Sequence, residues 1–442
     1  MSGPIPRSVV VVGGGLAGLT AAYRLACHGA RVTLLDRRAT LGGNALPPGQ
    51  GWESSPLTVS ACHQDTSGLL RALGLNIRAA CFSLVPLGFL RPDGTMALYP
   101  YTPLPRKLSL AVSLIRFAGL TWRERWRLVS WLEQIWEGAI QLPLDLAHRT
   151  ADEWLAALGQ GDQARRTVWE PLAQWLTGNE TRSLSADAFR RAIESTFLCP
   201  AGESRWTIIP SLHASLVQPM IKHLTKCGAT FLVDTEAAQL LSDGDRVTGV
   251  LLKNGSILQG EWYLAALPPR QLGMLLPERW LSRYAYFQQL VELGYVPTTH
   301  AQVIITRPLV KPRILLLSQG YFRSMVALPT GSGRTVCRFS GGDERAVVLN
   351  TSETLQAAVE EVLRSLNLLS PGHHVVSFDS QRYEEGSLSL QPGVQARRPL
   401  QCSPIANLLV AGAWTDTGWP ANVESAIVSA KRCAEIISES PL

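Results

Sequence analysis

The stretch SVVVVGGGLAGLTAAYRLAC, residues 8–27, decides the fold of this chain. Ser8–Val12 is an unbroken run of small and β-branched residues, which is the pattern of a buried parallel strand. After a glycine-rich interruption, Leu19–Cys27 is rich in alanine and predicts a helix that Gly29 ends. Arg31–Leu35 then predicts a second strand, so the chain opens with a β-α-β unit.

The interruption has the spacing G-x-G-x-x-G, and each glycine in it has a physical task. Gly13 permits the tight turn, Gly15 lets the backbone approach a pyrophosphate, and Gly18 allows the helix to pack closely on the strand. The helix N-terminus offers N–H groups to phosphates, and Asp36 ends the second strand, where a carboxylate can hold ribose hydroxyls. The dinucleotide-binding residues predicted from this segment are Gly13, Gly15, Leu16, Ala17, Gly18, Asp36 and Arg37.

Features far along the chain predict FAD rather than NAD. Leu41-Gly42-Gly43 follows Asp36 closely, and Ala411-Gly412-Ala413-Trp414 lies on a strand–loop–helix near the C-terminus. FAD is long, so its ring needs contacts distant in sequence from its adenine end. No second G-x-G-x-x-G follows a strand, so we expect an external electron donor. The further predicted FAD contacts are Gly42, Gly43, Asn44, Ala237, Gly412, Ala413, Pro420, Ala421, Asn422 and Val423.

Composition excludes several classes of protein. Hydrophobic residues make up 46% and charged residues 17% of the 442, which is typical of a globular protein. A net charge of +6 at this length does not indicate a nucleic-acid binder. The eight cysteines form no C-x-x-C pair, so they predict free thiols in a reducing compartment and no metal site. We expect a cytoplasmic protein with peripheral contact to the inner face of the membrane.

The expected fold class is α/β, with a discontinuous Rossmann-like FAD-binding domain and an α+β substrate domain. Residues 229–266 predict strands with a hairpin at Asn254-Gly255, and Leu408–Ala411 predicts a last buried strand before a closing helix, Val423–Ile437. The FAD-binding domain is predicted to comprise residues 1–80, 205–270 and 391–442, and the substrate domain residues 81–204 and 271–390.

Two narrower motifs carry a family resemblance. Trp169-Glu170-Pro171-Leu172 and the stretch AGAWTDTGWPA, residues 411–421, resemble the amine-oxidase and phytoene-desaturase superfamily, and within it the hydroxysqualene dehydroxylases of hopanoid biosynthesis. The resemblance implies a flavoenzyme with an FAD domain of the amine-oxidase type that acts on a long polyprenyl chain. It implies removal of the allylic hydroxyl of hydroxysqualene, with reduced FAD delivering hydride from N5 to give squalene.

The chain departs from the family pattern at four places. Asn44 stands where the family has an arginine near the pyrophosphate, and Ala413 stands where it has an aspartate for the ribityl hydroxyls. The family's G-Q-H segment falls on residues 55–57, and its asparagine after W-E-P-L falls on Gly178, one place before Asn179. Hydrogen bonds to charged groups contribute about 1.5–3 kcal/mol each, so these changes predict weaker FAD binding.

Three residues are candidates for catalysis. Trp419 lies in the presumed flavin loop, where an aromatic wall attracts a developing cation; the alternative is loop packing. Glu170 is either a general acid for hydroxyl departure or a partner for a helix start, and we favour the structural role. His63 lies near the displaced G-Q-H segment and is either a substitute acid or a structural histidine.

A basic segment, residues 103–136, carries a net charge of +4. Trp122, Trp126 and Trp136 recur near helical spacing with arginines between them, which predicts either a membrane-contacting face or an internal helix of the substrate domain. Three functions remain open at this stage: reductive dehydroxylation of hydroxysqualene, desaturation of a carotenoid precursor or oxidation of another apolar substrate, and a catalytically eroded accessory protein of a terpenoid pathway.

Overall fold

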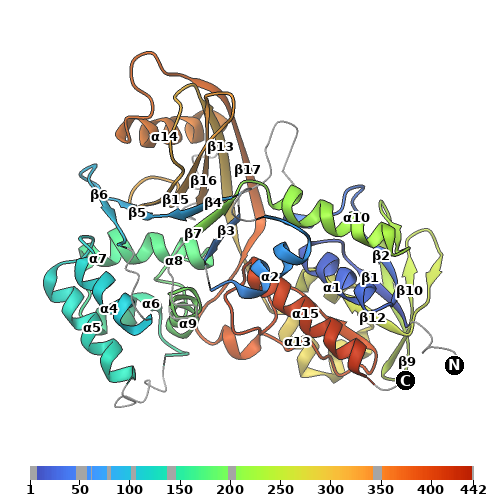
Figure 1. The fold of residues 1–442 in the computed structure, drawn as a ribbon. Helices are drawn as coiled ribbons and strands as arrows, with labels where there is room; N and C mark the ends of the chain where they lie inside the picture. Colours follow the sequence, from blue (N-terminus) through green and yellow to red (C-terminus); the bar gives the residue numbers. More distant parts are fainter. Residues whose placement is uncertain are drawn as a thin grey trace.

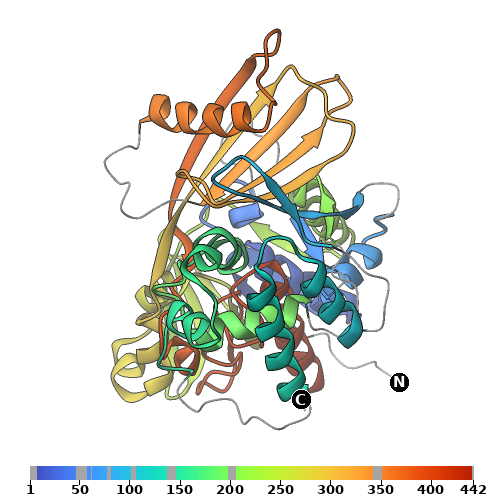
Figure 2. The same ribbon diagram turned by 90° about the vertical axis from the view of Figure 1, so that its left-hand side faces the viewer.

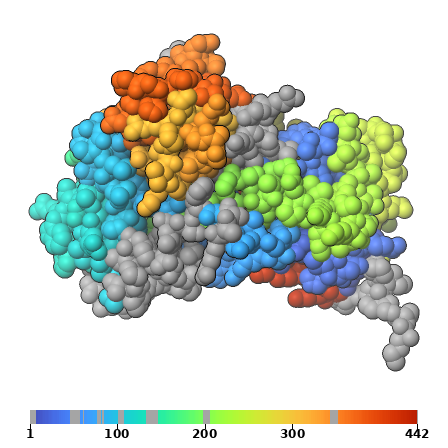
Figure 3. All heavy atoms as spheres, turned by 45° about the horizontal axis from the view of Figure 1, so that its top comes forward, coloured from blue at the N-terminus to red at the C-terminus, as the bar shows by residue number. Residues whose placement is uncertain are grey.

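The structure of the protein is a computed structural model, which describes residues 7–45, 57–60, 62–76, 81–100, 106–136, 146–197, 206–341 and 351–440. Figure 1 shows a lobe built around the N-terminal strands and α15, an upper sheet crossed by α14, and a helical lobe that contains α4 and α5. In the space-filling view, residues 81–136 form one end of the molecule and the β8–β10 region lies at the opposite end (Figure 3).

A parallel five-stranded sheet forms the first lobe. Its order is β18-β12-β1-β2-β8, and every neighbouring pair is parallel. The strands are β1 (Ser8–Val12), β2 (Arg31–Leu35), β8 (Thr230–Leu232), β12 (Trp262–Ala265) and β18 (Leu408–Val410). The two strands predicted at the N-terminus are confirmed. Because parallel neighbours in a sheet need crossover connections, segments that lie far apart in sequence meet in this sheet.

Helices α1 (Leu16–Cys27), α10 (Gln218–Lys226) and α15 (Val423–Glu439) pack together beside this sheet (Figure 1). The apolar core between them and the sheet includes Leu19 and Ile427, both fully buried. A small antiparallel sheet of β9 (Ala237–Asp243), β10 (Arg246–Leu252) and β11 (Ile257–Leu258) follows β8, and its second turn lies at the predicted hairpin.

A seven-stranded sheet lies above the other elements, in the order β17-β13-β16-β15-β14-β5-β6. Its strands are β5 (Leu87–Leu90), β6 (Met96–Leu98), β13 (Tyr295–Ile305), β14 (Arg313–Leu317), β15 (Ser324–Pro329), β16 (Thr335–Gly341) and β17 (Val375–Leu388). Helix α14 (Ser352–Ser365) covers one face of this sheet (Figure 2). The long strands β13 and β17 run from the upper sheet down to the first lobe (Figure 1).

The remaining elements surround the opposite face of the seven-stranded sheet and the base of the first lobe. A third antiparallel sheet has the order β3-β7-β4. Their bounds are β3 (Leu57–Ser60), α2 (Gln64–Ala72), β4 (Phe82–Val85), α4 (Arg106–Arg116), α5 (Trp122–Trp136), α6 (Ala151–Ala157), α7 (Asp162–Ala164), a π-helical turn (Arg165–Trp169), α8 (Glu170–Thr177), α9 (Ala186–Phe197), β7 (Trp206–Ile209), a second π-helical turn (His213–Val217), α11 (Pro269–Leu275), α12 (Glu278–Arg283), α13 (Ala285–Val291) and short 3₁₀ turns at Gly43–Ala45 and Val394–Arg397.

Three expectations can be compared with these elements. The mixed α/β class with a Rossmann-like domain is confirmed. The expectation that all cysteines are free thiols is wrong for Cys62, which is disulfide-bonded; Cys27, Cys81, Cys227, Cys337, Cys402 and Cys433 are free. Among the helices in the described ranges, none has the length and apolar character needed to cross a bilayer. The division into an FAD-binding and a substrate domain stays a proposal.

Candidate cofactor site and adjoining cavity

A cavity of about 870 Å³ lies at the carboxyl ends of the parallel strands, and we name it the cofactor cavity. In open α/β sheets, ligands bind in the crevice outside the carboxyl ends of the strands. Most of the predicted FAD contacts line it. These are Gly13, Gly15, Leu16, Ala17, Asp36, Arg37, Gly42, Gly43, Asn44, Ala237, Gly412, Ala413, Ala421, Asn422 and Val423.

The backbone around the glycine-rich loop fits a pyrophosphate. A Cβ on Gly15 would meet no atom within 4 Å, because that side of the residue faces the open cavity. A Cβ on Gly18 would lie 1.9 Å from the carbonyl oxygen of Gly13, so glycine is required for the helix to pack on the strand. Gly13 itself has φ 105°, a conformation that favours glycine. Gly18 therefore has a packing role and does not line the cavity.

Asp36 lies at the end of β2 with its carboxylate held by the backbone. Its Oδ2 accepts the N–H of Gly14 at 2.7 Å and its Oδ1 accepts the N–H of Arg38 at 2.8 Å. Each carboxylate oxygen has a second lone pair for a ligand hydroxyl. The orientation of Asp36 on the cavity wall thus agrees with its predicted role toward the ribose.

The C-terminal loop is shaped by Arg398, which the sequence did not single out. Its buried guanidinium donates to the carbonyl oxygens of Ala413 at 3.0 Å, Thr415 at 2.6 Å and Trp419 at 2.8 Å. Burial lowers the pKa of Arg398 to about 10, so the side chain is still charged at neutral pH. A cation at this position fixes the peptides of the loop whose other side lines the cofactor cavity.

Helix α15 begins beside the cofactor cavity. The Asn422 side chain accepts the N–H of Ser425 at 3.0 Å and caps the helix. Ala421, Asn422 and Val423 line the cavity at the positive end of this helix, which favours negative charge on a bound group. Pro420 is buried just before them and does not line the cavity.

A second cavity of about 390 Å³ adjoins the first, and we name it the polar cavity. The two share Gly386, Ser387, Ala421, Asn422 and Val423. Polar side chains on the walls of the polar cavity are Thr58, His63, Thr66, Gln174, Thr177, Thr196, Thr298, His300, Arg323, Ser324, Arg338, Ser340, Ser387, Asn422 and Glu424. It is therefore a place where a substrate would lie next to the cofactor.

His63 lines the polar cavity and is buried, and its neighbour Trp419 lies outside the lining. The two ring centroids are 5.0 Å apart. Nδ1 of His63 accepts the N–H of Ser60 at 2.9 Å, which leaves Nε2 as the protonated nitrogen of the neutral ring. Burial lowers the pKa of His63 to about 4. At neutral pH His63 is thus a neutral hydrogen-bond donor and not an imidazolium acid.

Glu170 lies outside the linings of both cavities. Its Oε2 accepts the N–H of Thr181 at 2.9 Å and its Oε1 accepts Gln174 Nε2 at 2.7 Å. These partners tie the start of α8 to the loop after it, which fits the structural role that the sequence favoured and not the catalytic one.

Asn179 also has a structural role. It is buried, its Nδ2 donates to the carbonyl oxygen of Leu388 at 2.9 Å, and its Oδ1 accepts the N–H of Leu390 at 2.9 Å. Gly178 before it lines the polar cavity with φ 73°. Of the displaced family segments, residues 55 and 56 lie outside the described residues, and Leu57 lines the polar cavity.

The sequence missed the contribution of β13 and β17. Gly386 lines both cavities, and a Cβ there would lie 2.5 Å from Thr298 Oγ1, so a glycine is needed where the two strands approach. His300, Arg338 and Ser340 come from strands that the sequence described only as mixed. The alternation of polar and apolar residues over His300–Val303 was the one available signal.

Comparison with known proteins identifies the family. The model of the flavin-containing amine oxidoreductases matches residues 16–438. The 15-cis-phytoene desaturase of Narcissus pseudonarcissus is 25% identical over 469 residues, which cover 99% of this chain and 80% of the relative. The zeta-carotene desaturase of Synechocystis sp. is 23% identical over 489 residues, which cover 97% of this chain and 96% of the relative.

Solved structures agree on the fold. Cyclohexylamine oxidase from Brevibacterium oxydans superposes with a TM-score of 0.71 at 15% identity, covering 98% of this chain and 99% of that structure. Wild-type putrescine oxidase bound to putrescine gives a TM-score of 0.72 at 16% identity, covering 98% and 99%. With the family match over nearly the whole chain, and a glycine loop and cavity that fit FAD, this protein belongs to the flavin-containing amine oxidoreductases and is an FAD-dependent oxidoreductase.

Proposed function

We propose that the protein acts on a polyprenyl substrate and that its reaction is the reductive dehydroxylation of hydroxysqualene to squalene. The polyprenyl class is supported by the relatives, whose names are those of carotenoid desaturases. The observation that carries the dehydroxylation is the junction of the cofactor cavity with a cavity whose lining combines apolar side chains with many hydrogen-bonding ones. A hydroxyl that leaves during the reaction needs such partners, whereas a hydrocarbon does not.

The residues of the chain have defined tasks in this reaction. Bound reduced FAD would supply the hydride that replaces the hydroxyl, which would leave as hydroxide and take up a proton from solvent. His63 donates a hydrogen bond from Nε2 to the departing oxygen, and its ring is held by Ser60. Trp419 packs on His63 and keeps this donor in place. Arg398 fixes the loop from Ala413 to Trp419, so it positions the cofactor side of the site.

The deciding experiment uses purified, flavin-loaded protein under anaerobic conditions with dithionite as the reductant. Hydroxysqualene should be converted to squalene, identified by gas chromatography and mass spectrometry. His63→Phe keeps the ring packing but removes the hydrogen-bond donor to the departing oxygen, so it should lower kcat by about two orders of magnitude or more. If the flavin-loaded, reduced enzyme leaves hydroxysqualene unchanged, the proposed reaction is wrong.

Desaturation of a carotenoid precursor is the second candidate, because the named relatives are desaturases. The same preparation, oxidised and supplied with phytoene and a quinone acceptor, tests it. New conjugated double bonds appear as visible absorbance. Turnover of phytoene but not hydroxysqualene selects desaturation, and turnover of neither selects the eroded accessory role.

We further propose that the helical lobe contacts the membrane that contains the substrate. Trp122 and Trp126 are 63% and 56% exposed, and their rings stack at 6.5 Å on the outer side of α5. Leu108 on α4 is also exposed, and Arg123 and Arg127 flank the two tryptophans. Glu124, the acidic residue of this turn, is buried and accepts the N–H of Gly161 at 3.0 Å. The exposed surface is thus apolar and basic, as peripheral binding to anionic lipid requires.

A further inference from the structure

The seven-stranded sheet has two unlike faces where β13, β15 and β16 run side by side. Successive residues of a strand point to opposite faces. One face carries Ala301, Val303, Ile305, Met325, Ala327, Cys337 and Phe339, which form a core with Leu355, Val359 and Leu363 of α14. The other face, which we name the polar face, carries the cross-strand pairs His300–Ser340 and Gln302–Arg338. The apolar side chains of Ile304, Val326 and Leu328 lie on the same face. His300, Ser324, Arg338 and Ser340 from this face line the polar cavity.

Hydrogen bonds within the polar face hold its side chains in order. Nδ1 of His300 lies 2.8 Å from Ser340 Oγ, and Arg338 Nε donates to Gln302 Oε1 at 3.0 Å. Burial lowers the pKa of His300 to about 4, so this ring is neutral at physiological pH. His63 stands on another wall of the same cavity. The polar cavity, which adjoins the cofactor cavity, therefore presents hydrogen-bonding groups from several elements.

A third cavity, of about 90 Å³, lies within the helical lobe, and we name it the apolar pocket. It is smaller than the roughly 150 Å³ cavity that accommodates benzene, so it has room for only the end of a chain. Among the described residues that line it, the charged ones are Arg190 and Glu194, which pair with each other at 2.6 Å. The other lining residues are Leu87, Phe89, Tyr99, Leu110, Leu114, Phe117, Leu120, Leu128, Trp131, Leu132, Trp154, Leu155, Leu158, Val168, Trp169, Leu172, Ile193 and Phe197.

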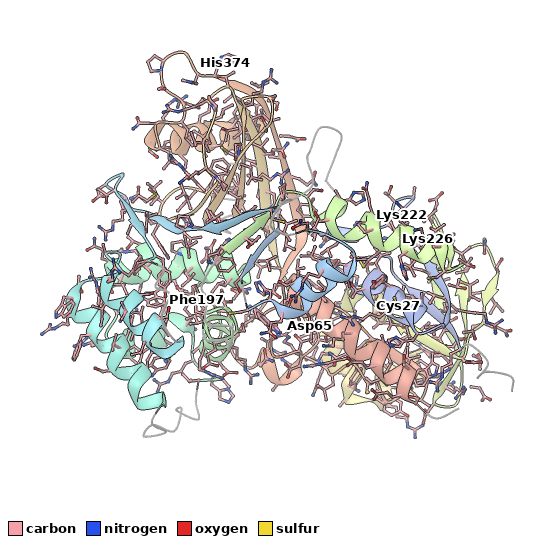
Figure 4. All side chains as sticks on the ribbon, viewed as in Figure 1. Cys27, Asp65, Phe197, Lys222, Lys226 and His374 are labelled. Carbon is pink, nitrogen blue, oxygen red and sulfur yellow. The ribbon has the colours of Figure 1, made fainter. Side chains whose placement is uncertain are left out.

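A row of aromatic rings connects the polar cavity with the apolar pocket. Trp206 lines the polar cavity, with its ring 4.4 Å from that of Trp175. Phe197 lines the apolar pocket, with its ring 6.4 Å from Trp206 and 5.8 Å from Tyr99. Figure 4 labels Phe197 between the helical lobe and the centre of the molecule. The row thus leads from the polar cavity into the lobe that carries α4 and α5.

We propose that the site selects an amphipathic polyprenoid and rejects a pure hydrocarbon. An oxygen-bearing group lies in the polar cavity against His300 and Arg338, and the hydrocarbon chain runs past Trp206 and Phe197 toward the apolar pocket. This inference rests on the proposed function in one respect, the polyprenyl nature of the substrate. A hydrocarbon in the polar cavity would remove water from buried polar groups without replacing their hydrogen bonds. Sites of this kind discriminate strongly against the analogue that lacks the oxygen.

Binding of farnesol and farnesene to the oxidised holoprotein tests the selectivity, with both compounds in the same detergent and the flavin absorbance as readout. Farnesol should bind at least tenfold more tightly than farnesene. Arg338→Met should reduce this ratio several-fold, and Arg334→Met, at an exposed position just before the same strand, should leave it unchanged. If Arg338→Met does not fold with FAD, His300→Phe supplies the same comparison.

The position of the chain is tested separately with geraniol and geranylgeraniol. Phe197→Asn places an amide in the aromatic row. It should therefore weaken the binding of geranylgeraniol several-fold more than the binding of geraniol. Equal binding of farnesol and farnesene, or a ratio that Arg338→Met and His300→Phe leave unchanged, overturns the inference. Because these titrations need no turnover, selective binding without dehydroxylation would contradict only the proposed reaction.

Discussion

At the scale of single residues, a side chain at Gly15 should prevent cofactor binding without disturbing the fold. A Cβ there enters the cofactor cavity and meets no protein atom. We expect Gly15→Val to abolish FAD binding while the melting temperature of the apoprotein stays close to that of the wild-type apoprotein. Flavin absorbance after reconstitution with excess FAD measures this. Gly68→Val is the matched control, because that glycine also has an open side and lies outside the cavity.

Asn44 and Ala413 line the cofactor cavity where relatives are expected to have charged residues. Asn44→Arg or Ala413→Asp should therefore tighten FAD binding by about 1–2 kcal/mol, since hydrogen bonds to charged groups exceed this value when geometry is ideal. Fluorescence titration of the apoprotein gives the dissociation constants. If neither variant improves on the wild type, other cations on the same wall, such as Arg37, already supply the missing contact.

The lowered pKa values of His63 and His300 predict that the protein loses stability in acid. Their pKa values in the folded chain are about 4, compared with an ordinary value of 6.5. Between these values the unfolded chain binds more protons than the folded chain, so the free energy of unfolding falls as the pH drops from 6.5 to 4. Each residue contributes roughly 3 kcal/mol to this fall. Urea unfolding of His300→Gln should show a weaker pH dependence than the wild type, and identical slopes would exclude the buried neutral ring.

At the scale of elements, one carboxylate joins the N-termini of two helices. Glu424 in the first turn of α15 accepts the N–H groups of Asp65 and Thr66 at the start of α2, both at 2.9 Å. Burial, the largest influence, raises its pKa, while these hydrogen bonds act in the opposite direction. The junction also borders the polar cavity, and Lys431 pairs with Asp65, labelled in Figure 4, at 2.8 Å.

Glu424→Gln should lower the free energy of unfolding by about 1–3 kcal/mol, because an amide presents one accepting oxygen where the carboxylate presents two. Denaturant unfolding measures the change. Glu435→Gln is the control, because this residue is exposed on the same helix. Equal effects of the two substitutions would mean that the junction does not stabilise the fold.

At the scale of the whole molecule, the helical lobe lies at the end opposite the β8–β10 region (Figure 3), and its exposed tryptophans predict how it binds lipid. The protein should co-sediment with anionic liposomes, partly reversed by high salt, since each basic residue contributes about 1 kcal/mol near the surface. Trp122→Ala with Trp126→Ala should remove the salt-resistant part, and Arg123→Glu with Arg127→Glu the salt-sensitive part.

Arg127 is exposed although it donates to the carbonyl oxygen of Gly159 at 3.1 Å, whereas Arg125 is half-buried and is excluded from these charge reversals because it has an internal role. It donates to the carbonyl oxygens of Leu120 at 2.7 Å and Ile115 at 2.8 Å, which joins α4 to α5. Val310 is also strongly exposed but lies in the loop before β14 and lines none of the three cavities, so Val310→Ala is a suitable control. If neither double substitution changes liposome binding, α5 is an internal helix of the lobe and does not contact lipid.

The sequence by itself determined the first β-α-β unit, the FAD class and most of the predicted residues that line the cofactor cavity. These features are local: a β-branched run, three glycines at fixed spacing and an acid at the end of a strand specify their own backbone. The boundaries of β1 and β2 follow from that pattern. Asp36, Gly15 and the start of α15 line the cofactor cavity for the same reason.

Only the tertiary structure decided the substrate side of the site. His300, Arg338 and Gly386 come from three strands whose register is set by pairing across long sequence separations, and no local pattern encodes that register. Arg398 gains its role because its buried guanidinium meets the carbonyl oxygens of a distant loop. Burial, which a sequence does not state, also makes His63 a neutral donor, because desolvation disfavours its charged form.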